Sequence, residues 1–270
     1  MRGILLPQQY LEGSATFFGH DFAVNDNVLI PRPETELLVD RALRILTGNP
    51  STTAASVLDL GTGSGNIAIS LILQLRSMPM AGKARGRYEC RVEPLTLRHC
   101  SGSMVSKAQG FHACRVEPLT KGHEAIRMIA SDLSADALAV AKENAARNGV
   151  AGRIEFIESD LFEKIPYLFD LIVSNPPYVA TEEYHDLPPE VLAEPRIALD
   201  GGSGGLEIIR SIVRQAASHL TAGGHLLLEI GWGQAVAVRS IVAGAGPLEL
   251  REIVKDDAGI ERIVVARKHG

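Results

Sequence analysis

The sequence predicts an α/β fold in which a doubly wound, mostly parallel sheet of seven strands ends in an antiparallel hairpin. Short apolar runs alternate with amphipathic stretches over residues 1–72 and 125–270. A turn with three glycines, 61–65, joins one apolar run directly to a helical pattern, and the last two apolar runs flank the turn sequence DDAG. Strands separated by helices favour a parallel sheet covered on both faces, and neighbouring strands around a short turn favour a hairpin.

The spacing of apolar residues, which differs between helices and strands, locates the expected elements along the chain. A β-like lead-in, 1–34, precedes the main domain, 35–270. Helices are expected at 35–46, from 66 onward, at 134–149 and at 205–220. Strands are expected at 56–61, 124–132, 154–160, 169–175, 225–231, 248–254 and 260–267. The helix 134–149 has the clearest end signals, because Ser134 can cap its first turn and Gly149 suits the position after its last.

Residues 73–124 interrupt this domain with a different texture. They are rich in Gly, Ser, Arg and Lys, and the heptapeptide CRVEPLT occurs at 90–96 and again at 114–120. Two copies are too few for a solenoid, so the segment is interpreted as a poorly ordered insertion. All 3 cysteines and several histidines fall inside it. Their spacing lacks the close pairs of zinc modules, so we expect no metal, with a zinc site as the alternative.

Composition excludes several classes of protein. The 46% hydrophobic share supports a sizeable core, and the net charge of -5 argues against a nucleic-acid-binding domain. No apolar run is long enough for a membrane span, and the N-terminus MRGILLPQQYLEG lacks the apolar region of a signal peptide. The expectation is a cytoplasmic monomer that contacts neither DNA nor a membrane.

The glycine-rich turn VLDLGTGSGN, 57–66, is the first candidate binding element. Gly61, Gly63 and Gly65 allow a tight turn and a close approach of ligand to the backbone, with Thr62 and Ser64 between them. The amides at the start of the following helix then face that ligand. No lysine of the phosphate-binding loop type follows, which disfavours a nucleoside triphosphate. A structural turn without ligand is the alternative.

An acid at the end of the next strand would support nucleoside binding, because it can accept both ribose hydroxyls. Asp132 lies 71 residues beyond Gly61, but leaving out the 50 residues 74–123 reduces the separation to 21, close to the expected spacing. Asp160 ends the following strand and could meet an adenine amino group, with Leu161 packing on the ring. The alternatives are a helix-capping role for Asp132 and a solvated turn for Asp160. S-adenosylmethionine, a nucleoside without phosphates, fits this set.

The sequence SNPPY, 174–178, ends the fourth strand at the same edge of the sheet. The side-chain oxygen of Asn175 and the carbonyl of Pro176 can accept the two hydrogens of a planar –NH₂ group. This grip aims the nitrogen lone pair at a methyl group, and rigid Pro176 and Pro177 hold the acceptors in place. Tyr178 can stack on the planar group. The alternative is a strand-ending turn with a surface tyrosine.

These residues resemble class I methyltransferases, and more narrowly the HemK/PrmC family of peptide chain release factor glutamine methyltransferases. The resemblance covers about residues 8–72 and 124–267. It rests on VLIPRPETE (28–36), VLDLGTGSGNIAISL (57–71), ASDLSADALAVAKENA (130–145), IVSNPPYV (172–179), EPRIALDGGSGGL (194–206) and LLLEIGWGQ (226–234). It implies a Rossmann-like methyltransferase sheet and methyl transfer from S-adenosylmethionine to N5 of the glutamine in the Gly-Gly-Gln loop of release factors.

The resemblance also implies roles for individual residues. The donor would contact residues 61–65, Asp132, Leu161 and Asn175, and residues 175–178 would hold the glutamine. The mouth of the site would be lined by Pro31, Arg32, Pro33 and Glu34. Phe22 would pack near the methionine end of the donor. Glu194 and Glu229 match family motifs, but the residues indicate no role for them.

Two departures leave alternatives open. The helical substrate-binding domain that precedes the methyltransferase domain in the family has no counterpart in 1–34, which would weaken recognition of the release factor. The insertion would be tolerated because the cost of a loop grows slowly with its length. A nucleic-acid adenine-N6 methyltransferase and a catalytically impaired donor-binding remnant are therefore the alternatives.

Overall fold

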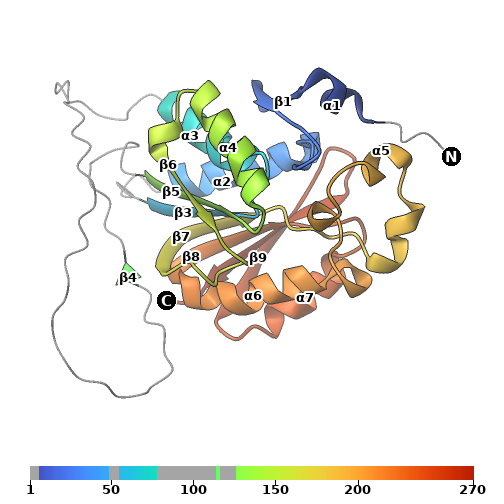
Figure 1. The fold of residues 1–270 in the computed structure, drawn as a ribbon. Coiled ribbons are helices and arrows are strands. Elements are labelled where there is room, and N and C mark those ends of the chain that lie inside the picture. Colours follow the sequence, from blue (N-terminus) through green and yellow to red (C-terminus); the bar gives the residue numbers. More distant parts are fainter. Residues whose placement is uncertain (1–5, 49–54, 78–113, 116–125) are drawn as a thin grey trace, which may run out of the picture.

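The computed structural model describes residues 6–48, 55–77, 114–115 and 126–270 (Figure 1). The main sheet runs in the order β6-β5-β3-β7-β8-β10-β9. Its strands are β3 (Ala55–Leu60), β5 (Ile126–Asp132), β6 (Ile154–Glu158), β7 (Tyr167–Ser174), β8 (Leu220–Glu229), β9 (Leu248–Lys255) and β10 (Glu261–Lys268). The five strands from β6 to β8 are mutually parallel, and β10 is antiparallel to both β8 and β9. The predicted fold class and closing hairpin are confirmed.

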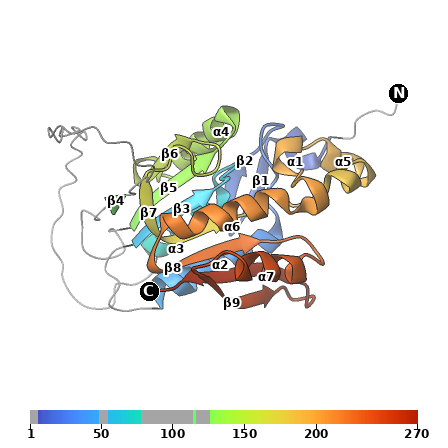
Figure 2. The same cartoon turned by 90° about the horizontal axis from the view of Figure 1, so that it is seen from below.

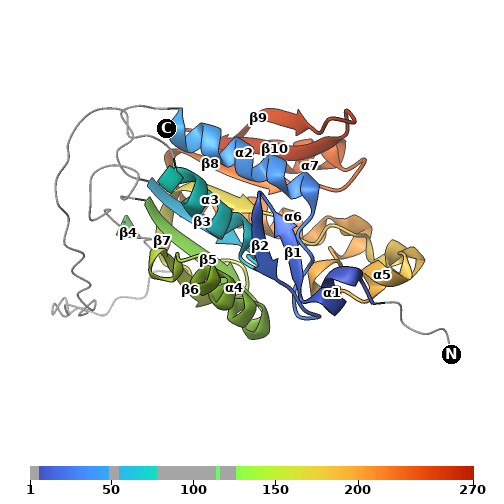
Figure 3. The ribbon, with the colours of Figure 1, turned by 90° about the horizontal axis from the view of Figure 1, so that it is seen from above.

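Helices cover both faces of the sheet. α6 (Glu207–His219) and α7 (Ala235–Ala243) lie on the face seen from below, and α2 (Pro33–Thr47), α3 (Asn66–Ser77) and α4 (Ala135–Arg147) lie on the opposite face (Figures 2 and 3). Successive strand residues enter different cores: Leu171 and Val173 pack with α2 and α3, whereas Ile172 between them packs with α6 and α7. The period of two in a strand therefore explains why β7 is apolar at every position over 171–173.

Three elements differ from the sequence prediction. Helix α3 continues to Ser77, so residues 73–77 at the start of the predicted insertion are helical. The two-residue strand β4 (Cys114–Arg115) pairs in parallel with the beginning of β7 and was not predicted. Helix α7 was also missed, although Ala235, Val238 and Val242 are buried at helical spacing. The predicted disorder of the insertion, and the zinc alternative with it, otherwise fall on 78–113 and 116–125, outside the described residues.

The lead-in contains more structure than the sequence indicated. A short helix, α1 (Gln8–Glu12), precedes an antiparallel pair of strands, β1 (Ser14–Phe17) and β2 (His20–Ala23). Phe17 and Phe22 meet edge to face at 6.0 Å between ring centroids and are buried in the same core as α2 and α3. The hairpin therefore packs on the main domain, where its strand β2 contacts α4 (Figure 3).

The chain between β7 and α6 forms a cover of short helices. They are η3 (Thr181–Asp186), α5 (Pro189–Leu192), η4 (Arg196–Ala198) and η5 (Ser203–Gly205). Outside this segment, one more short helix, η2 (Ala151–Arg153), precedes β6. Val179 and Asp200 form a parallel bridge that joins the beginning of this segment to a later part of it. No helix within the described ranges is long and apolar enough to cross a membrane.

Candidate active site

A cavity lies at the carboxyl ends of β3, β5, β6 and β7, where the predicted site residues were expected to meet. Its lining includes Gly61 to Ser64 after β3, Asp132 at the end of β5, Asp160 and Leu161 after β6, and Asn175 and Pro177 after β7. Pro31, Arg32 and Thr35 add a wall from the lead-in and the first turn of α2. Ligands of open α/β sheets bind at this edge, so the fold and the cavity agree on the location of the site.

The glycine turn is held from below by a buried carboxylate. Asp59 in β3 accepts hydrogen bonds from the Thr62 hydroxyl at 2.6 Å and the Ala68 amide at 3.1 Å, both on Oδ2. Burial raises the pKa of Asp59 to about 7, against the opposing effect of these two bonds. Gly61 and Gly63 have φ angles of 74° and 54°, which only glycine adopts without strain. The turn is therefore shaped by the backbone and fixed by Asp59.

Asp132 connects the glycine turn to the next helix. Its Oδ2 accepts the Gly63 amide at 2.8 Å, and its Oδ1 accepts the Ser134 amide at 2.9 Å. Burial raises its pKa. The Leu133 amide is a third backbone donor to this carboxylate, which still has capacity to accept a hydroxyl from the cavity. Ser134 itself caps α4, since its hydroxyl accepts the Ala137 amide, so the N-cap role belongs to Ser134.

Gly65 has a packing role. It does not line the cavity, although its neighbours 61–64 do. A Cβ atom on Gly65 would lie 2.9 Å from Ile69 Cδ1 and 3.2 Å from Ala141 Cβ, and its φ is 81°. Glycine at this position lets the turn pack tightly between α3 and α4.

Leu161 has a backbone conformation that is unusual for its residue type. Its φ is 45°, in the left-handed region, which costs about 1–2 kcal/mol for a residue with a Cβ. Its side chain lines the cavity and packs against the core below α6. Strained backbone often occurs at ligand-binding positions, where surrounding packing holds it in place. Asp160, directly before it, is exposed at the same wall.

Asn175 lies between two cavities. The second cavity is lined by Leu29, Arg32, Asn175, Pro176, Tyr178, Val179, Val191, Ala198 and Leu199, and it shares Leu29, Arg32, Asn175 and Ala198 with the first. Asn175 Nδ2 donates a hydrogen bond to the Thr35 hydroxyl at 3.1 Å. This bond leaves Oδ1 as the end of the amide that can accept a hydrogen bond from a ligand. A group in the second cavity could therefore meet a ligand of the first at Asn175.

Tyr178 is fixed by its backbone and by burial. Gln234 Nε2 donates to the Tyr178 carbonyl at 2.9 Å and to the Gly205 carbonyl at 3.3 Å, and Gln234 Oε1 accepts the Gly231 amide. Burial, and then the nearby Glu229, raise the pKa of the Tyr178 hydroxyl, so it stays neutral. The glutamine thus ties the loop after β7 to the loop after β8.

Other predicted residues lie outside the two cavities. Pro33 and Glu34 are exposed in the first turn of α2, and neither lines a cavity. Phe22 is buried in the core away from the cavity lining. Glu194, which had no assigned role, is buried and accepts both the Ile30 amide and the Arg32 guanidinium. It therefore holds Arg32 at the mouth that the two cavities share.

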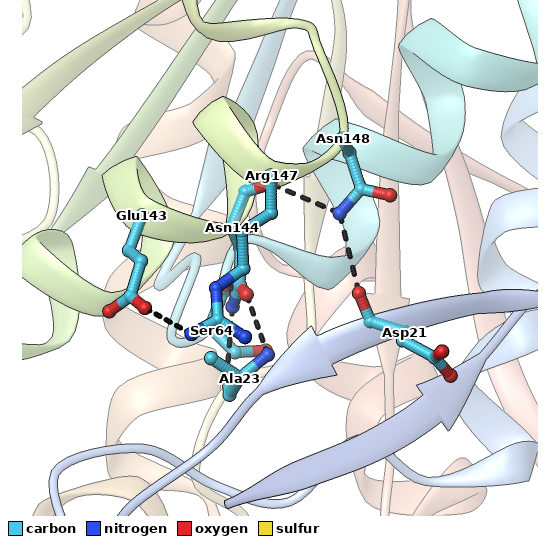
Figure 4. A network of polar contacts seen from close by, with 7 residues as sticks. All are labelled: Asp21, Ala23, Ser64, Glu143, Asn144, Arg147 and Asn148. Atoms are coloured by element: carbon cyan, nitrogen blue, oxygen red, sulfur yellow. Dashed lines mark hydrogen bonds and ion pairs between the residues drawn. The ribbon is translucent and has the colours of Figure 1, made fainter.

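Asn144 is a site residue that the sequence analysis missed. It is fully buried in α4, donates to the carbonyls of Ala23 and Ser64 and accepts the Ala23 amide (Figure 4). One side chain thus joins β2 to the glycine turn. The signal was present, because an asparagine one residue before Ala145 on the inner face of a helix needs buried partners.

Comparisons with known proteins find methyltransferases. The methyltransferase small domain model matches residues 116–204. A release factor glutamine methyltransferase of Cereibacter sphaeroides is 39% identical over 97% of this chain and 74% of its own length. One of Bordetella pertussis is 38% identical over 95% of this chain and 76% of its own length.

A solved structure shows the same fold at low identity. The ribosomal protein L11 methylase of Lactobacillus delbrueckii subsp. bulgaricus superposes with a TM-score of 0.54 and 17% identity, covering 92% of this chain and 84% of that one. The sequence relatives assign the chain to a family more narrowly than the fold does, because they match at more than a third identity over nearly all of this chain. The chain belongs to the release factor glutamine methyltransferase family.

Proposed function

We propose that this protein transfers a methyl group from S-adenosylmethionine to the side-chain N5 of the glutamine in the Gly-Gly-Gln motif of a peptide chain release factor. The observation that carries the proposal is the position of Asn175 between the two cavities, with its nitrogen held by Thr35 and its oxygen left to accept. A methyl donor in the first cavity and a glutamine side chain in the second would meet there.

The first cavity suits a nucleoside without phosphates. The Asp132 carboxylate accepts from the amides of Gly63, Ser134 and Leu133, and it still has capacity to accept a ribose hydroxyl. Leu161 and Asp160 offer an apolar surface and an acceptor at the far wall, fitting for an adenine ring and its amino group. No lysine lines the cavity in the described part of the chain, which disfavours a triphosphate.

The chain's own groups prepare the nitrogen. Bound S-adenosylmethionine supplies an electrophilic methyl group. The nitrogen of a carboxamide is a poor nucleophile because its lone pair is delocalised. Asn175 Oδ1 and the Pro176 carbonyl accept its two hydrogens and turn the lone pair toward the first cavity. As the nitrogen takes the methyl group it becomes acidic and loses one of these two protons, through its carbonyl acceptor, to water. Pro176 is buried, which limits movement of this acceptor.

The surroundings of the second cavity complete the proposed substrate site. Tyr178, which lines this cavity, would stack on the amide plane, and Arg32, held by Glu194, would provide a cation at the mouth for the peptide backbone. Pro177 lines the donor side of the same loop. Pro33 and Glu34, exposed next to this mouth, are proposed to contact the release factor outside the cavities. We further propose a monomer that acts in the cytoplasm and does not bind DNA.

A labelled methyl donor tests the proposal. The protein is incubated with S-adenosylmethionine carrying a labelled methyl group and either an intact release factor, the same factor with its motif glutamine replaced, or double-stranded DNA. Label in the intact factor alone supports the proposal. Label in DNA with none in the release factor would identify an adenine methyltransferase, since an adenine amino group is also a planar –NH₂. Donor binding by calorimetry with no transfer to either would identify a binding remnant.

A further inference from the structure

Glu229, at the end of β8, is a buried carboxylate that the proposed chemistry does not use. It is 2% exposed, and its Oε2 has no hydrogen-bond partner within the described residues. The groups around it come from three other elements: Thr35 and Glu34 from α2, Tyr178 from the loop after β7, and Arg262 from β10. A buried polar atom without a partner costs about 1–3 kcal/mol, so its presence calls for an explanation.

Thr35 connects Glu229 to Asn175. Its side chain is 1% exposed, it lies beside the Glu229 carboxylate, and its hydroxyl oxygen accepts from Asn175 Nδ2. A hydroxyl has one proton to donate. Because a charged carboxylate can only accept, a charged Glu229 attracts the protons of the two hydroxyls that face it, those of Thr35 and Tyr178. The Thr35 oxygen can then take only a donor from Asn175, which is the amide nitrogen.

We propose that charged Glu229 is a positioning residue that fixes the orientation of the Asn175 amide through Thr35, so that Oδ1 faces the substrate nitrogen. The proposal rests on the function proposed above. A protonated Glu229 can itself donate to the Thr35 oxygen. Thr35 is then free to donate to Asn175 Oδ1, and the amide can turn over and present its nitrogen to the substrate. An –NH₂ end facing a substrate –NH₂ cannot accept its hydrogens, so that orientation is inactive.

The titration of Glu229 places this control near neutral pH. Its pKa is raised to about 7: burial is the largest cause and Glu34 acts in the same direction, whereas Thr35, Arg262 and Tyr178 act in the opposite direction. The charged, active form therefore becomes the major form as pH rises through this value. Turnover is expected to rise with it, while donor affinity stays level because Glu229 does not line the donor cavity.

The kinetic test compares kcat from pH 5.5 to 8.5 for the wild type and five variants. Glu229→Gln and Thr35→Val should each lose the rise near pH 7 and fall at least about 10-fold in kcat at pH 8. Their combination should lose no more than either alone, because both act through one orientation. Thr35→Ser, which keeps the hydroxyl, should retain the wild-type profile. Glu252→Gln, an equal charge change on the exposed side of β9, is the matched control and should behave as wild type.

A second readout does not depend on turnover. The Asn175 side-chain amide is identified in a ¹H–¹⁵N spectrum by its loss in Asn175→Ala, and its resonances are followed with pH in the absence of substrate. They should shift with a midpoint near 7 in the wild type and stay constant in Glu229→Gln and Thr35→Val. Asn175 resonances that titrate identically in all three proteins, or a Glu229→Gln enzyme with wild-type kcat at every pH, would overturn the inference. Absence of methyl transfer by the wild type at pH 8 would instead overturn the proposed function, and the spectrum would still report on the orientation.

Discussion

At the scale of single residues, the site is built on buried carboxylates that are incompletely hydrogen-bonded. Asp59 under the glycine turn and Glu229 beneath Tyr178 are 0% and 2% exposed, and each has one oxygen without a partner within the described residues. Burial raises the pKa of both to about 7. Each carboxylate lies under a loop whose shape the site depends on. Burying the carboxylate lowers the stability of the fold, and holding the loop makes the site more precise.

These two carboxylates should make stability depend on pH. In the unfolded chain they lose their protons near pH 4, but in the folded protein they do so near pH 7. Between these values the folded state binds more protons, so the free energy of unfolding should fall as pH rises from about 4 to about 7. We expect Asp59→Asn to reduce that fall by roughly 2 kcal/mol in urea unfolding at pH 5 and pH 8. An identical pH dependence in variant and wild type would show that Asp59 titrates normally.

The residue types around the site could be predicted where they directly follow a strand in the sequence. Three glycines, an acid at the end of the next strand and the sequence Asn-Pro-Pro-Tyr all follow strands directly, and parallel strands bring their carboxyl ends together. Thr35, Asn144 and Gln234 were not predicted, because each acts on a loop from 29 to 140 positions away in the chain. The place of Asn144 on the inner face of a helix does indicate that it needs buried partners, but which partners these side chains find depends on how distant elements pack, and no local pattern encodes that.

At the scale of elements, the turn between β3 and α3 shows how packing and function share one segment. Residues 61–64 line the cavity, whereas Gly65 supports them by letting α3 and α4 approach each other. Asn144 and Asp132 tie the same turn to α4 and β5. The turn is therefore a rigid part of the domain, with its backbone amides already ordered before a ligand arrives.

Replacing Gly65 should be much more damaging than replacing a glycine of the same backbone conformation in open space. Gly65→Ala combines φ 81° with contacts of 2.9 Å and 3.2 Å, and we expect it to lower the free energy of unfolding by about 2–4 kcal/mol. Gly233→Ala has φ 80° but nothing within 4 Å of the new Cβ, so its cost should be about 1 kcal/mol. Urea unfolding of both variants measures the difference. Equal costs would mean that tight packing at Gly65 contributes nothing.

Element positions were predicted more reliably than element ends. The central strands β3 and β7 were recognised because their apolar runs are buried on both faces, and β9 and β10 because their apolar runs flank a short turn. Helix α7 was not predicted: it follows Gly231 and Gly233, which favour a turn. Helix α2 begins at Pro33, two residues before the predicted start at 35, because proline is well tolerated at the first helical position.

At the scale of the whole molecule, two cores on opposite faces hold the sheet, and the site lies at the edge where the strands β3, β5, β6 and β7 end. The lead-in closes that edge from one side and the cover between β7 and α6 closes it from the other. Because both closing segments contact the cavity, a ligand that fills it should stabilise the folded molecule as a unit.

Donor binding should therefore raise thermal stability. At a donor concentration 100 times Kd, the linkage relation gives about 2.7 kcal/mol of added stability. That gain corresponds to an increase in Tm of roughly 5–10 °C for a chain of this size. Asp132→Ala should abolish most of the increase at the same donor concentration, because it removes the carboxylate proposed to accept the ribose hydroxyls. A thermal shift of equal size with ATP in place of S-adenosylmethionine would contradict the phosphate-free assignment of the cavity.

The acceptor role of Asn175 is the central claim, and one variant tests it most directly. Methyl transfer to an intact release factor is measured for Asn175→Ala, and the Kd for S-adenosylmethionine is measured by calorimetry on the same preparation. We predict a loss in kcat of at least about 100-fold with a change in Kd of less than about 10-fold, because the side chain orients the substrate nitrogen and contributes little to holding the donor. Turnover by Asn175→Ala at the wild-type rate would contradict the account.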